Sequence, residues 1–243
     1  MGPESFTQHA WRAENYDADR FGGSFGTYLK EQEVALFLGM LEGRPDAVLD
    51  AGAGTGKLSL ALLEQKWNVT SLDLSWEMIG IARRKAADLG VPGRFAIADL
   101  QSLCFKDKAF GCTLSSRVLM HLHDWRAGMA ELCRVTKVLL VIDFPPHLSF
   151  AGLDALGKRR LPRRGDQPPQ AYAAFFLADV VEELKRGGFT VAEVVRSYFF
   201  PVRLHRWLDR PSLSRKLERL PAMLGLTGLI GAPVTVKAFR TQM

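Results

Sequence analysis

Apolar and polar residues follow two different periods along the chain, one typical of strands and one typical of helices. Short apolar runs bounded by glycine, proline or polar residues predict strands. Longer segments in which apolar residues recur every three or four positions predict helices. The predicted strands are 47–49, 69–72, 94–98, 111–115, 138–142, 189–200 and 234–239, and the predicted helices are 31–41, 57–65, 76–89, 125–135 and 178–186.

The alternation of these strands and helices favours an α/β fold, in which a parallel sheet carries helices on both faces. Ligands of such sheets bind beyond the carboxyl ends of the strands, near the point where the strand order reverses. Because the carboxyl ends of parallel strands meet at one edge, polar residues at those ends predict a single binding crevice. The residues in these positions are Asp50, Asp73, Asp99 and Ser116.

Two segments break the regular pattern. Pro145-Pro146 and Pro168-Pro169 interrupt any helix or strand, so we interpret residues 145–175 as an insertion. We also expect residues 201–232 to be irregular. The sequence still predicts one domain over 1–243, with a helical lid at 1–44, the binding core at 45–143, a basic insertion at 144–177, and the rest of the sheet with a substrate-side segment at 178–243.

The net charge of +6 comes from one region. Residues 158–219 hold fourteen Lys or Arg against seven Asp or Glu, and five of the basic residues lie between Lys158 and Arg164. A basic region can attract nucleic acid, an anionic membrane or an acidic small molecule, or it can simply form a hydrated surface. The whole composition, 47% hydrophobic and 24% charged, excludes a disordered or collagen-like chain.

The cysteines and the N-terminus indicate the compartment. Cys104, Cys112 and Cys133 form neither a C-x-x-C pair nor an even-numbered disulfide framework, so a reducing environment fits best. The N-terminus has no basic head followed by an apolar run, unlike a signal peptide. The apolar stretch 220–234 contains prolines and is too short to cross a bilayer. We therefore expect a cytoplasmic protein without a transmembrane helix or a metal site.

A glycine-rich turn directly follows the first predicted strand. Residues 48–57 read VLDAGAGTGK, and their three alternate glycines allow positive φ and leave no Cβ between the backbone and a ligand. The dinucleotide fingerprint would require glycine where Lys57 stands. The P-loop would require glycine in place of Ala51 and a hydroxyl residue in place of Leu58. Neither nucleotide-binding motif fits.

The same turn resembles the first motif of the class I S-adenosylmethionine-dependent methyltransferases, V-L-D-x-G-x-G-x-G. Four further segments resemble motifs of that family, in particular of its ubiquinone- and menaquinone-type members. SLDLSWEM at 71–78 is similar to G-x-D-x-S-x-x-M, and ADLQSLCF at 98–105 is similar to A-D-x-x-x-L-P-F. VLMHLHDW at 118–125 is similar to V-L-x-H-L-x-D, and ELCRV at 131–135 is similar to E-x-x-R-V.

The resemblance covers residues 46–143 and departs from the family at two positions, where Cys104 replaces a proline and Gly111 an aspartate. It implies a Rossmann-like, doubly wound sheet of seven strands, mostly parallel with an antiparallel C-terminal strand, plus N-terminal helices and a cap insertion. It also implies that S-adenosylmethionine binds and that S-adenosylhomocysteine is the product. The resemblance assigns cofactor binding to Asp50, Gly52, Gly54, Gly56, Asp73, Leu74, Met78, Asp99, Leu100 and Ser116.

In the family, the acid matching Asp50 fixes the glycine loop and the cofactor's amino group. The acid matching Asp73 accepts the ribose hydroxyls, and the acid matching Asp99 faces the adenine amino group. Each residue also has a purely structural interpretation, because Asp50 and Asp73 can cap the following helices and Met78 can belong to the core. Four polar strand ends in register favour the binding site.

The resemblance implies methyl transfer to a small-molecule acceptor. The methyl group of a sulfonium is already activated, so the main task of the protein is to align the incoming nucleophile. A hydroxyl or an acidic carbon would also need a base, for which His121 is the first candidate and His147 the second, although either can be structural. Tyr16, Arg20 and Tyr28 are candidate lid residues.

Apolar residues around Phe175, Phe176 and 220–230 favour an acceptor with an aromatic or lipid-like body, and the basic residues of 158–164 can recognise an acidic group on it. Nucleic acid is therefore not the expected partner, although the basic surplus leaves an RNA methyltransferase open. A non-catalytic, peripheral membrane-binding protein that uses the basic residues of 203–219 is a second alternative. An NAD-dependent oxidoreductase is a third.

Overall fold

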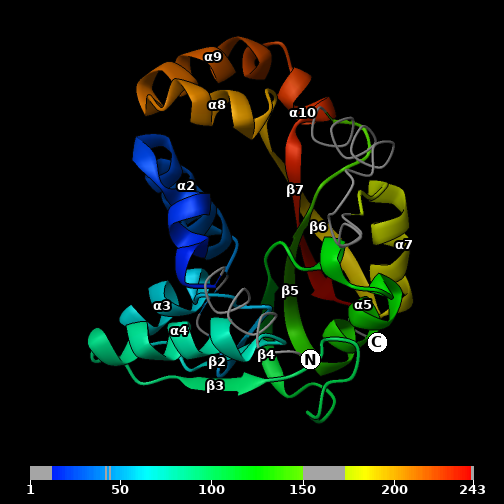
Figure 1. Cartoon of the computed structure of the whole chain (residues 1–243). Coiled ribbons are helices and arrows are strands. Elements are labelled where there is room, and N and C mark those ends of the chain that lie inside the picture. The colour runs from blue at the N-terminus through cyan, green and yellow to red at the C-terminus, as the bar shows by residue number, and fades with distance from the viewer. Residues whose placement is uncertain (1–12, 42, 44, 150–172, 242–243) are drawn as a thin grey trace, which may run out of the picture.

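A computed structural model describes residues 13–41, 43, 45–149 and 173–241. In this part of the chain one seven-stranded sheet forms the centre of the molecule, and helices cover both of its faces (Figure 1). The strands are β1 (Val48–Ala51), β2 (Val69–Asp73), β3 (Arg94–Ile97), β4 (Phe110–Ser115), β5 (Thr136–Phe144), β6 (Phe189–Tyr198) and β7 (Ala232–Arg240). The helices are α2 (Gly23–Gly39), α3 (Lys57–Glu64), α4 (Trp76–Asp88), η1 (Leu119–His121), α5 (Trp125–Val135), α7 (Leu177–Arg186), α8 (Val202–Leu208), α9 (Pro211–Met223) and α10 (Leu226–Ile230).

The strands lie in the order β3-β2-β1-β4-β5-β7-β6, so the strand order reverses between β1 and β4. Neighbours among β1 to β5 are parallel, whereas β7 runs antiparallel to both β5 and β6. The carboxyl ends of β1, β2, β3 and β4 therefore meet at one edge of the sheet. The predicted Rossmann-like fold with an antiparallel C-terminal strand is confirmed.

Two buried apolar clusters lie on opposite faces of this sheet. In β5, Leu139 and Val141 belong to one cluster, and Leu140 and Ile142 belong to the other. Since successive side chains of a strand point to opposite faces, the two clusters are on opposite sides. Helices α2, α3 and α4 contribute to the cluster around Val141, and α5 and α7 contribute to the cluster around Ile142.

The prediction that residues 201–232 are irregular is wrong, because this segment forms α8, α9 and α10. Its prolines misled the interpretation, since they occupy positions that helices tolerate. Pro201 is the N-cap of α8 and Pro211 is the first residue of α9, where a missing N–H costs nothing. Pro221 lies in the last turn of α9 and is buried. Residues 150–172 of the predicted insertion at 145–175, including the basic residues of 158–164, lie outside the described residues.

Helix α2 also begins earlier than the predicted helix at 31–41. It starts at Gly23 and includes Gly26, and glycines normally weaken a helix. Gly26 is required here by close packing, because a Cβ at this position would lie 2.4 Å from the backbone of Phe21. Residues 13–21 form a further helical segment before α2. The predicted division into lid, core, insertion and C-terminal part stays a prediction.

Residues 199–231, which we call the C-terminal cap, connect β6 to β7 at the edge where the parallel strands end. The cap reaches across this edge to α2 (Figure 1). The ring of Phe25 in α2 is stacked on His205 with 5.2 Å between centroids, and the N–H of Phe25 donates to Asp209 Oδ1 at 2.7 Å. Glu218 accepts the N–H groups of Phe199 and Phe200, which fixes α9 to the end of β6. An N-terminal helix and the C-terminal cap thus contact each other beyond the edge of the sheet.

Over the described residues, none of the helices combines the length and the apolar character that a membrane span needs.

Candidate functional site

The glycine-rich turn after β1 is held in place by backbone hydrogen bonds to β2. The N–H groups of Gly52 and Ala53 both donate to the carbonyl of Leu72, at 2.8 and 2.7 Å. The N–H of Gly54 donates to Asp73 Oδ2 at 2.8 Å. All three glycines of the turn have positive φ, which explains why the sequence places glycine at alternate positions.

Two glycines of the turn serve different purposes. A Cβ on Gly52 would lie 2.1 Å from a methyl group of Val118, so this position must be glycine for packing. A Cβ on Gly54 would meet no heavy atom within 4 Å. The backbone at Gly54 therefore borders open space, as a turn that cradles a ligand requires.

Asp50 supports the turn from below. It is buried, and its Oδ2 accepts hydrogen bonds from the N–H and the hydroxyl of Ser59, at 3.0 and 2.5 Å. Ser59 in turn accepts a hydrogen bond from Ser71 at 2.7 Å. Burial raises the pKa of Asp50 to about 6. These contacts fasten the turn to the first turn of α3, and contact between Asp50 and a cofactor stays a prediction.

Asp73 lies at the end of β2 and is only half-buried. Beside its bond from Gly54, its Oδ1 accepts the N–H of Ser75 at 2.9 Å. The helix cap of α4 is Ser75 itself, whose hydroxyl accepts the N–H of Met78. Each carboxylate oxygen still has a lone pair that can accept a hydroxyl. Asp73 therefore both holds the glycine turn and presents a charged acceptor at the strand end.

Asp99 lies beside Asp73, because the N–H of Ala98 donates to the carbonyl of Asp73 at 3.1 Å. The side chain of Asp99 accepts the N–H of Gln101 at 2.9 Å. The other predicted cofactor residues occupy different environments. The side chain of Leu74 is 67% exposed, whereas that of Leu100 is buried in the core and that of Met78 is half-buried.

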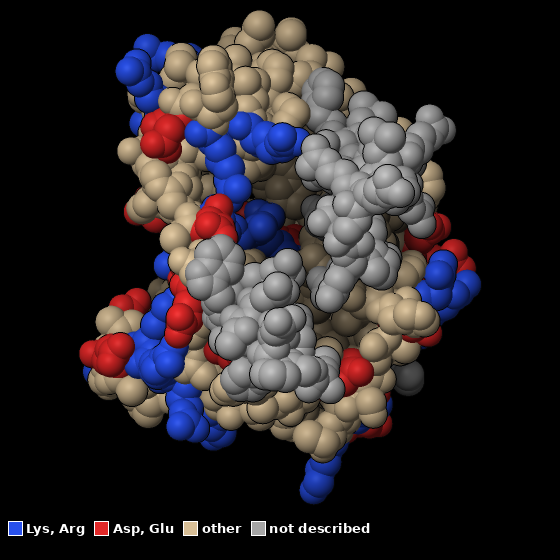
Figure 2. Space-filling view, viewed as in Figure 1, with Lys and Arg blue, Asp and Glu red and all other residues tan. Residues whose placement is uncertain are grey.

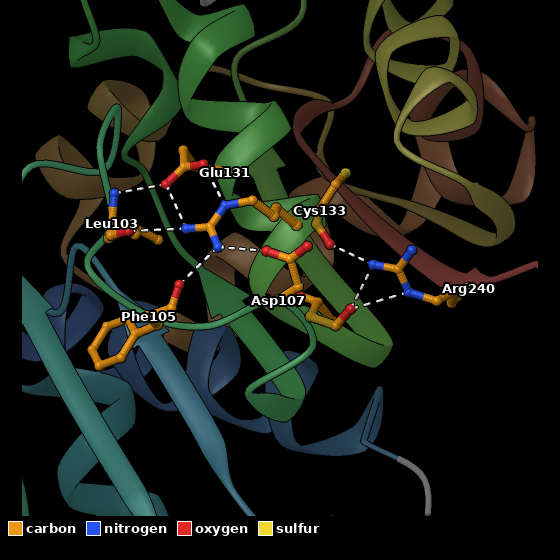
Figure 3. Close-up of polar contacts among 8 residues, drawn as sticks. Leu103, Phe105, Asp107, Glu131, Cys133 and Arg240 are labelled. Carbon is orange, nitrogen blue, oxygen red and sulfur yellow. Dashed lines mark hydrogen bonds and ion pairs between the residues drawn. The ribbon is translucent and has the colours of Figure 1, made fainter.

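The segment 99–109, which carries Asp99, is anchored by the E-x-x-R sequence of α5 (Figure 3). The guanidinium of Arg134 donates to both carboxylate oxygens of Glu131, at 2.6 and 2.9 Å. It also donates to the carbonyls of Leu103 and Phe105, at 2.9 and 2.7 Å. Glu131 completes the contact by accepting the N–H of Leu103 at 2.7 Å. This motif is therefore a positioning device for the loop behind Asp99.

A second polar cluster lies at the ends of β4 and β5, and Ser116 is the member of it that the sequence predicted. Ser116 donates to Asp143 Oδ2 at 3.3 Å, and the N–H of Arg117 donates to Asp143 Oδ1. Lys57 donates to Ser116 at 3.3 Å and to Glu33 at 2.7 Å, and Arg117 also pairs with Glu33. Burial raises the pKa of Asp143 to about 6. Figure 2 shows basic side chains inside a hollow at the centre of the molecule, with acidic ones beside them.

Only part of this cluster left a signal in the sequence. Asp143 directly follows a predicted strand, as Asp50 and Asp73 do, and this position could have identified it. Glu33 and Lys57 belong to no motif and meet only through the packing of α2 on α3.

The helical segment 13–21 is fastened to the glycine turn. Asp17 accepts the hydroxyl of Thr55 at 2.6 Å and pairs with Lys85 of α4. Burial alone would raise the pKa of Asp17, but the hydrogen bonds from Lys85 and Thr55 lower it. Arg20 acts electrostatically on Lys57, Asp143 and His121.

Two of the three candidate lid residues therefore lie in this segment beside the site. The guanidinium of Arg20 lies 6.0 Å from the ring centroid of Tyr16. Tyr28 lies elsewhere, with its ring 5.5 Å from the guanidinium of Arg215. A lid function for these residues stays a prediction.

The two candidate bases differ in their surroundings. His121, in η1, is exposed as a whole residue, but the surrounding protein partly desolvates its ring. This burial and the charge of Arg20 lower the pKa of His121, while Asp73 opposes them. His147 packs its ring against Phe176, with 4.4 Å between centroids. Across the described residues, His121 is the candidate that interacts with the predicted site.

A groove of about 490 Å³ lies between α2, the end of β6 and α9. Glu33 belongs both to this groove and to the polar cluster around Lys57. Glu33 is bonded to Lys57, and Glu218 accepts two backbone N–H groups. The three arginines of the groove, Arg196, Arg215 and Arg219, form no ion pair with a carboxylate of the described residues. The residues that line it are Tyr28, Gln32, Glu33, Leu36, Val195, Arg196, Ser197, Tyr198, Ser214, Arg215, Glu218, Arg219 and Ala222.

No group of three or more His, Cys, Asp or Glu among the described residues is arranged to hold a metal ion.

Comparison with known proteins places this geometry in a family. Residues 48–138 match the model of a family described as a methyltransferase domain. The chain is 37% identical over 128 residues to a demethylmenaquinone methyltransferase of Thermus thermophilus, which covers 51% of the chain and 58% of that relative. It is 33% identical over 146 residues to a malonyl-[acyl-carrier protein] O-methyltransferase of Serratia marcescens, covering 58% of the chain and 55% of that relative.

Solved structures agree on the fold. Magnesium protoporphyrin IX methyltransferase from Synechocystis, solved with S-adenosylhomocysteine, superposes with a TM-score of 0.61 at 21% identity and covers 88% of this chain and 83% of its own. Residues 48–138 therefore match a methyltransferase domain, and the described part of the chain has the fold of a solved methyltransferase structure, in agreement with the resemblance in the sequence. The matches to the two relatives span little more than half of their lengths.

Proposed function

We propose that the protein transfers a methyl group from S-adenosylmethionine to a small-molecule acceptor with an aromatic or lipid-like body, which can carry an acidic group. One observation carries the proposal: the glycine turn, open at Gly54, lies beside the carboxylates of Asp73 and Asp99 at adjacent strand ends. Three binding groups in a row suit the three parts of a sulfonium nucleoside, its amino acid, ribose and adenine.

The described residues fit this cofactor. The backbone at Gly54 can approach a ligand without a side chain between them, and Asp73 can accept ribose hydroxyls. Asp99 can accept a hydrogen bond from an amino group, and the contacts of Arg134 hold the segment 99–109 in place. The bound sulfonium would supply an electrophilic methyl group, so the protein itself mainly has to orient the acceptor.

We assign the proton transfer, where the acceptor needs one, to His121. Burial and Arg20 lower the pKa of this imidazole, so it is neutral at neutral pH and can accept a proton. Its electrostatic interaction with Asp73 supports a position near the ribose-binding end of the site.

The names of the relatives support the proposed acceptor, because one names demethylmenaquinone and the other a malonyl-[acyl-carrier protein]. The groove beside α2 adds a physical argument. Leu36, Val195 and Ala222 give it an apolar lining, and Arg215 and Arg219 offer charges to an acidic group. Its connection to the polar cluster through Glu33 supports its assignment to the body of the acceptor.

Calorimetry with S-adenosylhomocysteine tests the cofactor assignment. Asp73→Ala should weaken binding by about 1–3 kcal/mol, because ribose hydroxyls lose a charged acceptor. Asp73→Asn keeps one oxygen for the Gly54 N–H and should lose less. Asp88→Ala, at an exposed aspartate at the end of α4, is the matched control and should bind normally. Equal affinity in all four proteins would contradict the proposal.

A methylation assay tests the base. His121→Ala should keep its affinity for S-adenosylhomocysteine and slow transfer roughly 100-fold or more, the usual contribution of a positioned base. His123→Ala changes a neighbouring exposed histidine and should transfer normally. Full activity of His121→Ala would remove this residue from the mechanism.

An acceptor panel tests the substrate class. Labelled S-adenosylmethionine should transfer its methyl group to amphipathic molecules such as a naphthoquinol or a fatty acid, and not to total RNA. Salt-sensitive transfer to RNA alone would favour the nucleic-acid alternative instead.

A further inference from the structure

Large apolar side chains are concentrated on the outside of the C-terminal cap. Six of the fourteen exposed large apolar residues in the described part of the chain belong to residues 199–231. Five of the six have more than half of their surface exposed, although burial of such side chains is normally favourable. The six are Trp207 (80%), Leu213 (42%), Leu220 (63%), Met223 (74%), Leu224 (63%) and Leu229 (68%).

The leucines of α9 and its C-cap form one continuous stripe. Leu213, Leu217, Leu220 and Leu224 are spaced by four, three and four residues, which puts them on a single face of the helix. The residues of α9 that line the groove lie on the other side of the helix. They are Ser214, Arg215, Glu218, Arg219 and Ala222. Leu217 is half-buried, whereas Leu213, Leu220 and Leu224 are exposed, so the stripe points away from the groove and mainly into solvent.

Basic residues outnumber acidic ones in the cap that carries the stripe. The cap contains six Lys or Arg and two acidic residues, Asp209 and Glu218. Glu218 is turned inward to the N–H groups of Phe199 and Phe200 and to His205, whereas Asp209 is exposed and accepts the N–H of Phe25. Arg210 and Lys216 are exposed. In Figure 2 the surface over α8 and α9 is mainly uncharged, and its left edge carries basic side chains with an acidic one among them.

This combination selects among possible partners. Nucleic acid would use the basic residues but would leave the leucine stripe in water. A second copy in a two-fold dimer would cover the stripe but would bring the cationic caps together. An anionic lipid surface satisfies both, because apolar side chains enter the boundary of the acyl chains while basic ones remain among the headgroups.

We propose that the outer face of α8–α10 docks on an anionic membrane surface. The leucine stripe, Met223 and Trp207 insert at the boundary between headgroups and acyl chains, and Arg210 and Lys216 contact the headgroups. This peripheral contact does not depend on the methyl acceptor or on methyl transfer.

Vesicle co-sedimentation of the full chain tests the proposal. The protein should bind vesicles of phosphatidylcholine mixed with phosphatidylglycerol, and binding should weaken as salt screens the charges. Vesicles of phosphatidylcholine alone should bind far less. Equal binding to both kinds of vesicle, or to neither, would overturn the proposal.

A matched pair of variants separates docking from folding. Leu220→Ser combined with Leu224→Ser should lower vesicle affinity roughly tenfold or more, because apolar insertion is lost. Leu89→Ser, at an exposed leucine after α4, should bind vesicles normally. Both proteins should keep the melting temperature and the S-adenosylhomocysteine affinity of the parent. Undiminished vesicle binding by the double variant would refute the docking face.

Fluorescence then locates the contact. Vesicles with brominated acyl chains should quench part of the tryptophan emission, and Trp207→Phe should remove that part while the protein still binds. Quenching that persists in Trp207→Phe would place another surface on the membrane. A dimer that Leu220→Ser and Leu224→Ser abolish, without any vesicle binding by the parent, would instead assign the stripe to a second copy.

Discussion

Two aspartates at strand ends are buried, and their protonation depends on the fold. Burial raises the pKa of Asp50 and of Asp143 to about 6, compared with 3.8 for an unperturbed aspartate. Between these pH values the folded chain binds protons that the unfolded chain does not. Both charges therefore cost stability at neutral pH, and the protein gains stability as the pH falls from about 6 to about 4.

Asp143→Asn should for this reason stabilise the protein without ligand at pH 8. The amide can accept the N–H of Arg117 but carries no buried charge. We expect a gain of about 1–3 kcal/mol in the free energy of unfolding, measured by urea denaturation, that shrinks as the pH falls through 6. Asp46→Asn, at an exposed aspartate, is the control and should leave the free energy of unfolding at pH 8 unchanged. A loss of stability at pH 8 would mean that the attraction between Lys57 and the Asp143 carboxylate outweighs the free-energy cost of burying that charge.

At the residue scale, the sequence predicted the polar residues and glycines that belong to a motif or follow a strand. The glycines of the turn, Asp73 and Asp99 follow strands in the order expected, and the structure brings them to one edge. Their roles toward a cofactor stay predictions. The cluster of Glu33, Lys57 and Arg117 could not be predicted, because it joins residues far apart in the sequence through helix packing.

At the scale of elements, prediction succeeded where local pattern and tertiary packing agree. β1, β2, β4 and β5 and the helices α3, α4 and α5 have clear periodicity and buried faces, so the observed bounds follow the predicted ones closely. The edge strand β3 is largely exposed, and its alternating pattern alone predicted it. The cap helices fail this test. The leucines of α9 face outward rather than toward a core, and Pro221 interrupts the pattern. A helix that buries only a small face against the protein lacks the periodic apolar pattern by which buried helices are predicted.

Arg134→Lys tests an element, the loop from β3 to β4. Lysine keeps the charge but cannot donate at once to Glu131 and to two backbone carbonyls. We expect a loss of about 1–3 kcal/mol in unfolding free energy and weaker binding of S-adenosylhomocysteine, because the loop carries Asp99. Calorimetry and urea denaturation measure the two effects.

Arg83→Lys, at an exposed arginine of α4, is the control for Arg134→Lys and should change neither quantity. Normal ligand affinity in a destabilised Arg134→Lys protein would show that the anchor serves only the fold.

At the scale of the whole molecule, the contact between α2 and the C-terminal cap joins distant parts of the chain. Phe25 is fully buried against His205 and Tyr198. Phe25→Ala should cost about 3–5 kcal/mol if the cap and the sheet unfold together, because it leaves a large cavity. Urea denaturation followed by circular dichroism should then show one transition, shifted to lower urea.

Trp207→Ala removes an 80% exposed ring of the same cap and should leave the transition unchanged. If Phe25→Ala instead produced two separate transitions, the cap would be an independent folding unit.

β6 and β7 lie side by side and pair antiparallel, from Phe189 opposite Arg240 to Tyr198 opposite Ala232. The two strands have the connectivity of a β-hairpin, and the C-terminal cap is the segment that joins them. The pairing fixes only where this segment begins and ends, and it constrains neither its length nor its sequence. A different segment between the same two strands would therefore give the protein a new outer surface, while β1, β2 and β3 at the far side would keep their geometry.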